Sequence, residues 1–306
     1  MKIYAPQYYK DFVCIADKCK HSCCVGWEID IDNATLDKYA DYKGRYSREI
    51  LESIDGNGDP HFRLDKNDRC PHLDEKGLCK IILNAGEDYL CHICREHPRF
   101  YNQTSLGLQV GIGMACEEAC RIILQSDDYA TFCEIGEEDG ESCCGTFDSF
   151  AHIARTYETL MDFSVGHSDK LYRISCDYNV DVKFYSDDEW RKLIGSLEFL
   201  HEPHKQIFAG FCVDAKPQEN LEKALERAFA YFVYRHCAEA WNEEEFCTSL
   251  GFCLFCERLL ASMWAADGNA DVCELARILS EEIEYSEENV ETIKNVFYIQ
   301  QTTKGI

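Results

Sequence analysis

Positive charge is scarce in this chain. Among its 306 residues, 31 lysines and arginines stand against 56 aspartates and glutamates, which gives a formal net charge of -25. Such a surface repels the phosphates of nucleic acids and the headgroups of anionic lipids. We therefore expect no nucleic-acid partner. A basic protein or a cationic substrate would be attracted instead, although an acidic surplus more often serves solubility alone.

Long apolar runs are also missing from the sequence. The opening residues MKIYAPQYYKDFVC contain no apolar core followed by a small-residue cleavage site, as a secretory signal would. The most apolar stretch, residues 250–256, is followed at once by Glu257 and Arg258, well short of the roughly 20 residues that span a membrane. We expect a soluble, cytoplasmic protein with no membrane partner.

A glycine-rich nucleotide-binding turn is poorly represented. The closest pattern is Gly107-x3-Gly111-Ile112-Gly113, which lacks the spacing and the following long helix of a dinucleotide-binding strand, turn and helix. No alternation of strands with helices accompanies it, so we expect no parallel sheet. A cofactor would have to be bound by some other arrangement.

Cysteine, in contrast, is abundant. The chain has 20 cysteines, of which thirteen lie before residue 150 and the other seven are scattered. Because the cytosol keeps thiols reduced, this density indicates metal or redox chemistry rather than a framework of disulfides.

The spacing of the early cysteines brings thiolates back to a common point. The densest run is Cys14-x4-Cys19-x3-Cys23-Cys24, and further cysteines follow a Cys-Pro loop and a Cys-Arg segment. Thiolates select zinc or iron–sulfur, and four ligands complete a centre, so eight ligands would make two sets. The predicted metal ligands are Cys14, Cys19, Cys23, Cys24, Cys70, Cys79, Cys94 and Cys116.

Most remaining cysteines fit the role of small buried hydrophobes in apolar helical context. This set comprises Cys133, Cys176, Cys212, Cys237, Cys247, Cys253, Cys256 and Cys273. Cys91 and Cys120 could belong to either class. Cys91-x2-Cys94 could alternatively be a thiol–disulfide pair, but no thioredoxin-like strand and helix flank it.

The hydrophobic pattern predicts a mainly α protein. Apolar residues recur at helical spacing from Leu221 to His236, and similar patterns cover 147–163, 188–200, 246–266 and 272–283.

The N-terminal part has polar turns and short helices, one capped by Asp32 and one over 45–54. We predict a cysteine-rich metal-binding region of short helices and loops over residues 1–125 and a helical bundle over 146–306. The bundle should bury Leu225, Phe229, Phe232 and Leu279, and the acidic interval 134–141 with Cys143 and Cys144 is the expected junction.

Three segments together resemble the flagellin lysine N-methylase family. They are CysIleAlaAspLysCysLysHisSerCysCysValGlyTrpGluIleAspIleAsp from Cys14, CysProHisLeuAspGluLysGlyLeuCysLysIle from Cys70, and CysArgGluHisProArgPhe from Cys94. The paired cysteine, Cys-Pro loop and Cys-Arg segment are also similar to the broader family of eight-cysteine zinc- or iron-chelating domains. GlyTrpGluIleAspIleAsp at 26–32, GlyGluAspTyr at 86–89 and HisProArgPhe at 97–100 fit the methylase branch better.

The resemblance implies an enzyme that transfers methyl groups from S-adenosylmethionine to lysines of flagellin. It also implies an iron–sulfur cluster, expected as 4Fe-4S, held by these cysteines, with zinc as the alternative. Two readings from other classes stay open: a non-enzymatic zinc- or iron-chelating module and an electron-transfer iron–sulfur protein. The chain departs from the family after Cys116, where Glu117 replaces the usual proline. The spacing also differs from the Cys-x3-Cys-x2-Cys of radical S-adenosylmethionine enzymes, so no radical mechanism is carried over.

Methyl transfer to lysine needs a neutral amine, although the ordinary lysine pKa is about 10.4. The acidic residues near the motifs are potential bases or simply a solvated face, and the sequence assigns none of them a catalytic role. They are Glu28, Asp30, Asp32, Glu87, Asp88 and Glu118.

The aromatic and basic residues of the motifs have two possible roles each. Trp27 and Tyr89 could face a cation or pack in the core. Arg95, His97 and Arg99 could bind a carboxylate or cluster sulfurs, or form surface salt bridges.

Overall fold

The computed structural model describes residues 1–139, 145–216, 218–266 and 271–303. Helices account for 55% of the chain and strands for 10%, so the predicted mainly α class is confirmed. The chain forms two compact units. We call residues 13–100 and 116–118 the cysteine-rich unit, and residues 1–12, 101–115 and 119–306 the helical unit. This division differs from the predicted 1–125 and 146–306, because the first strand and residues 101–115 belong with the helices.

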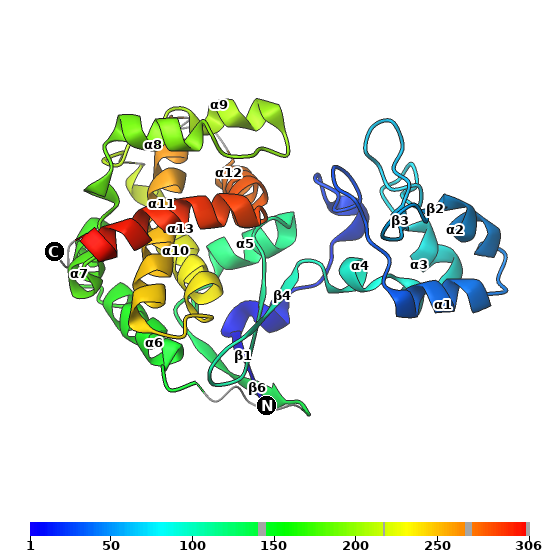
Figure 1. The fold of residues 1–306 in the computed structure, drawn as a ribbon, viewed down its shortest axis with the longest axis horizontal. Coiled ribbons are helices and arrows are strands. Elements are labelled where there is room, and N and C mark those ends of the chain that lie inside the picture. The colour runs from blue at the N-terminus through cyan, green and yellow to red at the C-terminus, as the bar shows by residue number, and fades with distance from the viewer. Residues whose placement is uncertain (140–144, 217, 267–270, 304–306) are drawn as a thin grey trace. The chain divides into compact units, whose positions relative to one another are not determined.

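The cysteine-rich unit consists of loops and short helices, as predicted (Figure 1). Its elements are 3-10 turns at Ala16–Lys18 and Glu87–Tyr89, helices α1 (Asn33–Asp41), α2 (Ser47–Ser53), α3 (Lys80–Ala85) and α4 (His92–Glu96), and strands β2 (Ile54–Asp55) and β3 (His61–Phe62). Asp32 caps α1, as the sequence indicated: its side chain accepts hydrogen bonds from the Thr35 backbone at 3.0 Å and the Thr35 hydroxyl at 2.8 Å. The same carboxylate accepts the His92 backbone N–H at 2.8 Å, which ties α1 to α4.

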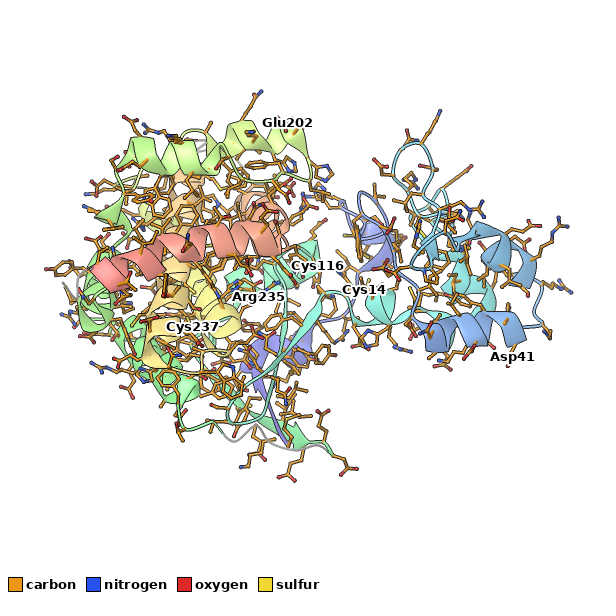
Figure 2. All side chains as sticks on the ribbon, in the orientation of Figure 1. Cys14, Asp41, Cys116, Glu202, Arg235 and Cys237 are labelled. Atoms are coloured by element: carbon orange, nitrogen blue, oxygen red, sulfur yellow. The ribbon has the colours of Figure 1, made fainter. Side chains whose placement is uncertain are left out.

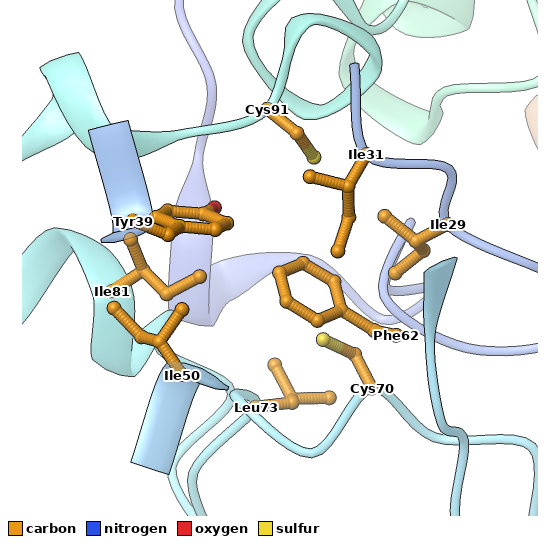
Figure 3. Packing of buried hydrophobic residues seen from close by; sticks show 9 residues of the cluster. All are labelled: Ile29, Ile31, Tyr39, Ile50, Phe62, Cys70, Leu73, Ile81 and Cys91. Atoms are coloured by element: carbon orange, nitrogen blue, oxygen red, sulfur yellow. The ribbon is translucent and has the colours of Figure 1, made fainter. Parts of the chain in front are cut away.

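The core of this unit mixes aliphatic, aromatic and thiol side chains (Figure 3). Its buried members are Ile29, Ile31, Tyr39, Ile50, Phe62, Cys70, Leu73, Ile81 and Cys91. The side chains of three further cysteines pack against it, namely Cys24, Cys79 and Cys94. The thiols are therefore part of what this small unit buries.

The helical unit contains long helices over residues 146–306, as predicted, and the described residues there include no strand. Its elements are a 3-10 turn at Gln7–Asp11, α5 (Glu117–Gln125, which starts in the cysteine-rich unit), α6 (Ser149–Leu160), α7 (His167–Tyr178), α8 (Asp187–Ile194), α9 (Lys205–Phe208), α10 (Glu222–Cys237), α11 (Glu243–Ala266), α12 (Val272–Leu279), a π-helical turn (Ser280–Glu284) and α13 (Glu287–Thr303), with 3-10 turns at Val182–Phe184, Glu202–His204 and Glu219–Leu221. The four residues predicted to be buried, Leu225, Phe229, Phe232 and Leu279, are all buried.

Helix α11 is the core of the helical unit, where it packs against α10 and α13 (Figure 1). It is long and apolar enough to cross a membrane by length and composition, yet 89% of its most apolar window is buried inside the protein. Gly251 allows the close approach of α11 to α13, because an added Cβ there would overlap the ring of Phe297.

The prediction that no parallel sheet occurs is wrong. A four-stranded sheet has the order β4 (Arg99–Gln103), β5 (Leu108–Ile112), β1 (Lys2–Pro6) and β6 (Phe132–Glu137). β1 pairs with β5 in parallel and with β6 antiparallel. The strands are only five or six residues long and the partners of β1 lie more than 100 residues away, so local patterning carried too little signal.

This small sheet is not a nucleotide-binding fold. Gly111 and Ile112 lie within β5 itself rather than in a phosphate-binding turn. The sheet is fastened to α10 instead: the Tyr234 hydroxyl donates to the Tyr4 carbonyl at 2.9 Å, and Gln109 Nε2 donates to the Tyr234 carbonyl.

Three smaller expectations need correction or qualification. Cys133 lies on strand β6 rather than on a helix, and Cys176 on α7 is exposed rather than buried. The acidic interval expected as a junction begins inside β6, since residues 134–137 pair with β1. Cys143 and Cys144 lie outside the described residues.

Replacing Gly251 with valine should destabilise the helical unit by about 2 to 3 kcal/mol, because the added methyls force α11 and α13 apart. Urea unfolding followed by circular dichroism measures the change. Gly210→Val is the matched control, since nothing lies within 4 Å of a Cβ placed there. Equal midpoints for the two variants would contradict the proposed close packing.

Candidate metal centre

All eight predicted ligands lie in the cysteine-rich unit. Four of them come from the loop at residues 14–24 around the 3-10 turn Ala16–Lys18, and Cys116 directly precedes α5. Cys79 and Cys91 are the residues before the first turns of α3 and α4, and Cys94 lies within α4. Because each cysteine sits at a helix end or in a tight loop, short segments distant in sequence can present thiols to a shared space.

The first thiol group comprises Cys14, Cys19, Cys23 and Cys116. A hydrogen bond to Cys24, burial and the negative charge of Cys24, Cys14 and Cys116 all raise the pKa of the Cys23 thiol. Burial raises the pKa of Cys19 to about 12, with further contributions from Glu117 and Cys116. Figure 2 labels Cys14 and Cys116, which are 102 positions apart in the sequence. The structure thus brings together four of the predicted ligands.

Glu117 links the two chain segments of the first thiol group. Its Oε2 accepts hydrogen bonds from the backbone of Lys20 at 2.7 Å and of His21 at 3.3 Å, and lies 3.6 Å from Cys19 Sγ. The carboxylate therefore holds the 19–21 loop next to the residue that follows Cys116. Sequence reasoning treated Glu117 only as a departure from a family pattern and missed this positioning role.

The second thiol group comprises Cys24, Cys70, Cys79, Cys91 and Cys94. Cys91 Sγ and Cys94 Sγ lie 3.2 Å apart, and the Cys70 backbone N–H donates to the Cys24 carbonyl at 2.8 Å. Burial raises the pKa of Cys70 to about 12, and the charges of Cys24, Cys79 and Cys91 raise it as well. Four of these five cysteines were predicted ligands.

Cys91, which the sequence left undecided, belongs to this group. It is 1% exposed and lies in the core beside Ile31 (Figure 3), and its Sγ is the atom that lies 3.2 Å from Cys94 Sγ. The signal that could have found it is its spacing from Cys94. Cys120, the other undecided residue, lies in the helical unit, where its Sγ donates to the Cys273 carbonyl at 3.3 Å.

The adjacent residues Cys23 and Cys24 connect the two groups. The hydrogen bond with Cys23 lowers the pKa of Cys24 to about 7, with help from the Ser22 hydroxyl and the positive charge of Arg69. The indole of Trp27 donates to the Cys23 carbonyl at 2.7 Å, so this side chain fixes the cysteine pair rather than offering a free binding face.

His72 in the Cys-Pro loop and Arg95 after Cys94 both have structural partners. His72 is buried between the Tyr46 hydroxyl and the Ser53 hydroxyl, each at 2.9 Å, and burial lowers its pKa to about 4. Both ring nitrogens are thereby engaged, so His72 is not placed as a thiol-site ligand. Arg95 pairs with Glu96 at 3.5 Å, the salt-bridge alternative.

The donor set fits a soft or borderline metal. Nine thiols gather in one unit, where burial and hydrogen bonds between thiols raise the pKa of several of them and repulsion between neighbouring thiolates adds to the shift. A bound cation removes that repulsion and stabilises the deprotonated form. The first group offers four thiols, the usual number for a tetrahedral or cubane centre, and the second offers five.

If each group holds its own centre, Cys14→Ser and Cys79→Ser should each lower the metal content by about half, and the double variant should lose nearly all of it. Metal and sulfide analysis of anaerobically purified protein measures the loss. Cys176→Ser, on an exposed face of α7, is the control and should retain full content. Complete loss in either single variant would instead indicate one shared centre.

Three relatives share detectable sequence similarity with this chain. Proteins named lysine-N-methylase from Salmonella choleraesuis and Salmonella typhimurium are each 28% identical over 142 residues, 42% of this chain and 34% of their own length. A flagellar biosynthetic protein FliU from Salmonella muenchen is 29% identical over 136 residues, 40% of this chain and 77% of its own length. The match thus spans about a third of the two lysine-N-methylases.

No protein-family model matches the chain. No solved structure matches it either. The relatives nevertheless confirm the resemblance to the flagellin lysine N-methylase family that the cysteine motifs indicated.

Proposed function

We propose that this chain is an S-adenosylmethionine-dependent protein lysine N-methyltransferase that acts on flagellin and holds an iron–sulfur cluster on its cysteines. The observation that carries the cluster assignment is the gathering of nine thiols in the cysteine-rich unit. The names of the relatives support lysine methylation and a flagellar context. Reduced thiols at this density support a cytoplasmic location.

The cysteine-rich unit would bind the cluster through the two thiol groups. Glu117 would hold the first group together, and Asp32 would fix α4, which carries Cys94, against α1. Bound there, an iron–sulfur cluster would supply a redox-active centre whose potential depends on burial and on hydrogen bonds to its sulfurs. S-adenosylmethionine would supply the methyl group.

The substrate lysine must enter an environment that attracts its ammonium and then lets it lose a proton. A cavity of about 320 Å³ in the helical unit has suitable charge. Its lining includes the carboxylates of Glu239, Glu244 and Glu245 against the single cation Lys294. Glu245 is engaged at its helix end, where it accepts the Trp241 backbone N–H at 2.8 Å, so Glu239 and Glu244 are our candidates for amine binding.

The electrostatics of the whole chain favour the same substrate class. A net charge of -25 attracts lysine-bearing surfaces at low ionic strength, and salt weakens that attraction. The amine reacts only when neutral, so the fraction of reactive lysine rises with pH toward its pKa.

A structural role for the metal is the second candidate. Cys70 and Cys91 are buried among Ile29, Tyr39 and Phe62, so the thiols occupy positions that apolar side chains fill in other small cores. Metal bound there would stabilise the fold of the unit even if it took no part in methyl transfer.

With S-adenosylmethionine and flagellin under anaerobic, reducing conditions, the intact protein should add the mass of one CH2 per transfer to flagellin lysines. Peptide mass spectrometry locates the modified lysines. Adding S-adenosylmethionine should also perturb the electron paramagnetic resonance spectrum of the reduced cluster if the two are in contact. A protein that carries its full metal content yet neither binds S-adenosylmethionine nor methylates flagellin would refute the methylase proposal in favour of the structural one.

The double variant Glu239→Gln/Glu244→Gln should raise KM for flagellin roughly tenfold, because each lost carboxylate removes an interaction of about 0.5 to 1 kcal/mol with the ammonium. The apparent affinity for S-adenosylmethionine and the metal content should not change. Glu243→Gln is the control, since this neighbouring carboxylate is exposed and does not line the cavity. A KM that moves equally in the double variant and the control would remove the cavity from the proposal.

A further inference from the structure

A second group of metal-ligating side chains lies in the helical unit, far in sequence from the thiols. His201, Glu281 and Glu282 each offer one ligand atom, and these three atoms all lie within 4.8 Å of one another. An imidazole nitrogen with two carboxylate oxygens is a donor set that first-row divalent cations bind in proteins. No motif in the sequence pointed to it, because 80 residues separate the histidine from the carboxylates.

Two irregular backbone segments create this arrangement. His201 directly precedes the 3-10 turn Glu202–His204, whose first residue is labelled in Figure 2. Glu281 and Glu282 lie on the π-helical turn Ser280–Glu284, which continues α12. A π-turn widens the helix locally and is found mostly as single turns, frequently at functional sites.

The loop that carries His201 is held rigidly over the π-turn. Glu282 Oε2 accepts the Leu200 backbone N–H at 2.6 Å, and Glu282 Oε1 accepts the His201 backbone N–H at 3.1 Å and faces His204 Nδ1 at 2.6 Å. Asn289 exchanges hydrogen bonds with the backbone of Glu198 at 2.9 and 2.8 Å and donates to the Glu282 carbonyl at 2.8 Å. The histidine and the two carboxylates are therefore already in place, which lowers the cost of binding an ion.

The Glu282 carboxylate retains room for a cation despite these partners. A carboxylate has about four acceptor positions, and the three donors occupy three of them. Its side chain is fully shielded from solvent. A carboxylate in that environment gains more from a bound cation than an exposed one, because water screens the attraction less.

Negative charge around the group exceeds positive charge. Glu281 Oε2 is shielded from solvent and accepts no hydrogen bond of regular geometry, although Arg277 Nη1 lies 3.0 Å away. Arg277 is shared with Glu274, whose Oε1 lies 3.0 Å from Nη2. Arg277 is therefore shared by two carboxylates, and Glu282 is paired with His204 instead. The group has three carboxylates to one guanidinium, and a divalent cation would reduce that excess of negative charge.

We propose that His201, Glu281 and Glu282 bind a divalent first-row transition-metal ion, separately from any metal on the cysteines. His204 contacts Glu282 and acts as a positioning residue for that carboxylate. The nitrogen and oxygen donors distinguish this site chemically from the thiol groups, since thiolates select softer ions.

Manganese tests the proposal because Mn²⁺ prefers oxygen and nitrogen donors to thiolates. Titration of the full-length protein, purified with its cysteine-bound metal, should remove about one Mn²⁺ per chain from the electron paramagnetic resonance signal of the free ion. His201→Ala and Glu281→Gln should weaken Kd by about tenfold or more. Glu202→Gln makes the same charge change as Glu281→Gln on an exposed neighbour and should leave Kd within about twofold of the wild type.

Thermal unfolding provides the second readout. Mn²⁺ should raise the Tm of the wild type and of Glu202→Gln, because the ion binds only the folded state, and it should not raise the Tm of His201→Ala. A wild-type protein that takes up no Mn²⁺ at millimolar concentration would overturn the proposal, as would variants that bind as tightly as the wild type. Neither readout involves methyl transfer, so a failure here is distinguishable from a failure of the proposed function.

Discussion

The crowding of thiols in the cysteine-rich unit is the constraint on which the rest of that unit depends. Five cysteines line or pack against a core of few large apolar side chains, and of the other four, three lie in the loop at residues 14–24 and the fourth is Cys116. Burial raises the pKa of Cys19 and Cys70, hydrogen bonds to neighbouring thiols together with burial raise the pKa of Cys23 and Cys94, and repulsion between nearby thiolates adds to each shift. A small unit with such a core would gain stability from a cation bound by the thiols, which is part of the proposal for this site.

The positioning residues around the thiols follow from the same constraint. Asp32 caps α1 and simultaneously binds the backbone at His92, so one carboxylate fixes the helix that carries Cys94. Glu117 performs the equivalent task for the loop after Cys19. Both carboxylates accept hydrogen bonds mainly from backbone N–H groups, and these bonds hold them near the thiols.

The helical unit uses cysteine and charge in a different way. Cys237 and Cys253 meet at 3.8 Å within the buried contact of α10 and α11, where they pack as small apolar side chains. Charged groups there are buried in closed networks: Glu284 contacts His236 at 2.7 Å and Arg235 at 3.6 Å, and Arg235 donates to the Tyr231 hydroxyl at 2.7 Å. Although burial opposes it, Arg235 and His236 hold the pKa of Glu284 below its ordinary value. The buried carboxylate is thereby compensated.

The sequence by itself determined the features that depend on neighbours along the chain. Helical periodicity located α6, α10, α11 and α12, and Asp32 was identified as a cap, because a helix forms its hydrogen bonds within one segment. The dense cysteine spacing likewise identified eight of the nine thiols that the structure gathers. Only the tertiary structure decided the parallel pairing of β1 with β5, the division of the thiols into two groups, the place of Cys91 and the meeting of His201 with Glu281 and Glu282. Each of these joins segments distant in sequence, and the packing that selects one such pairing over others leaves no periodic trace in either segment.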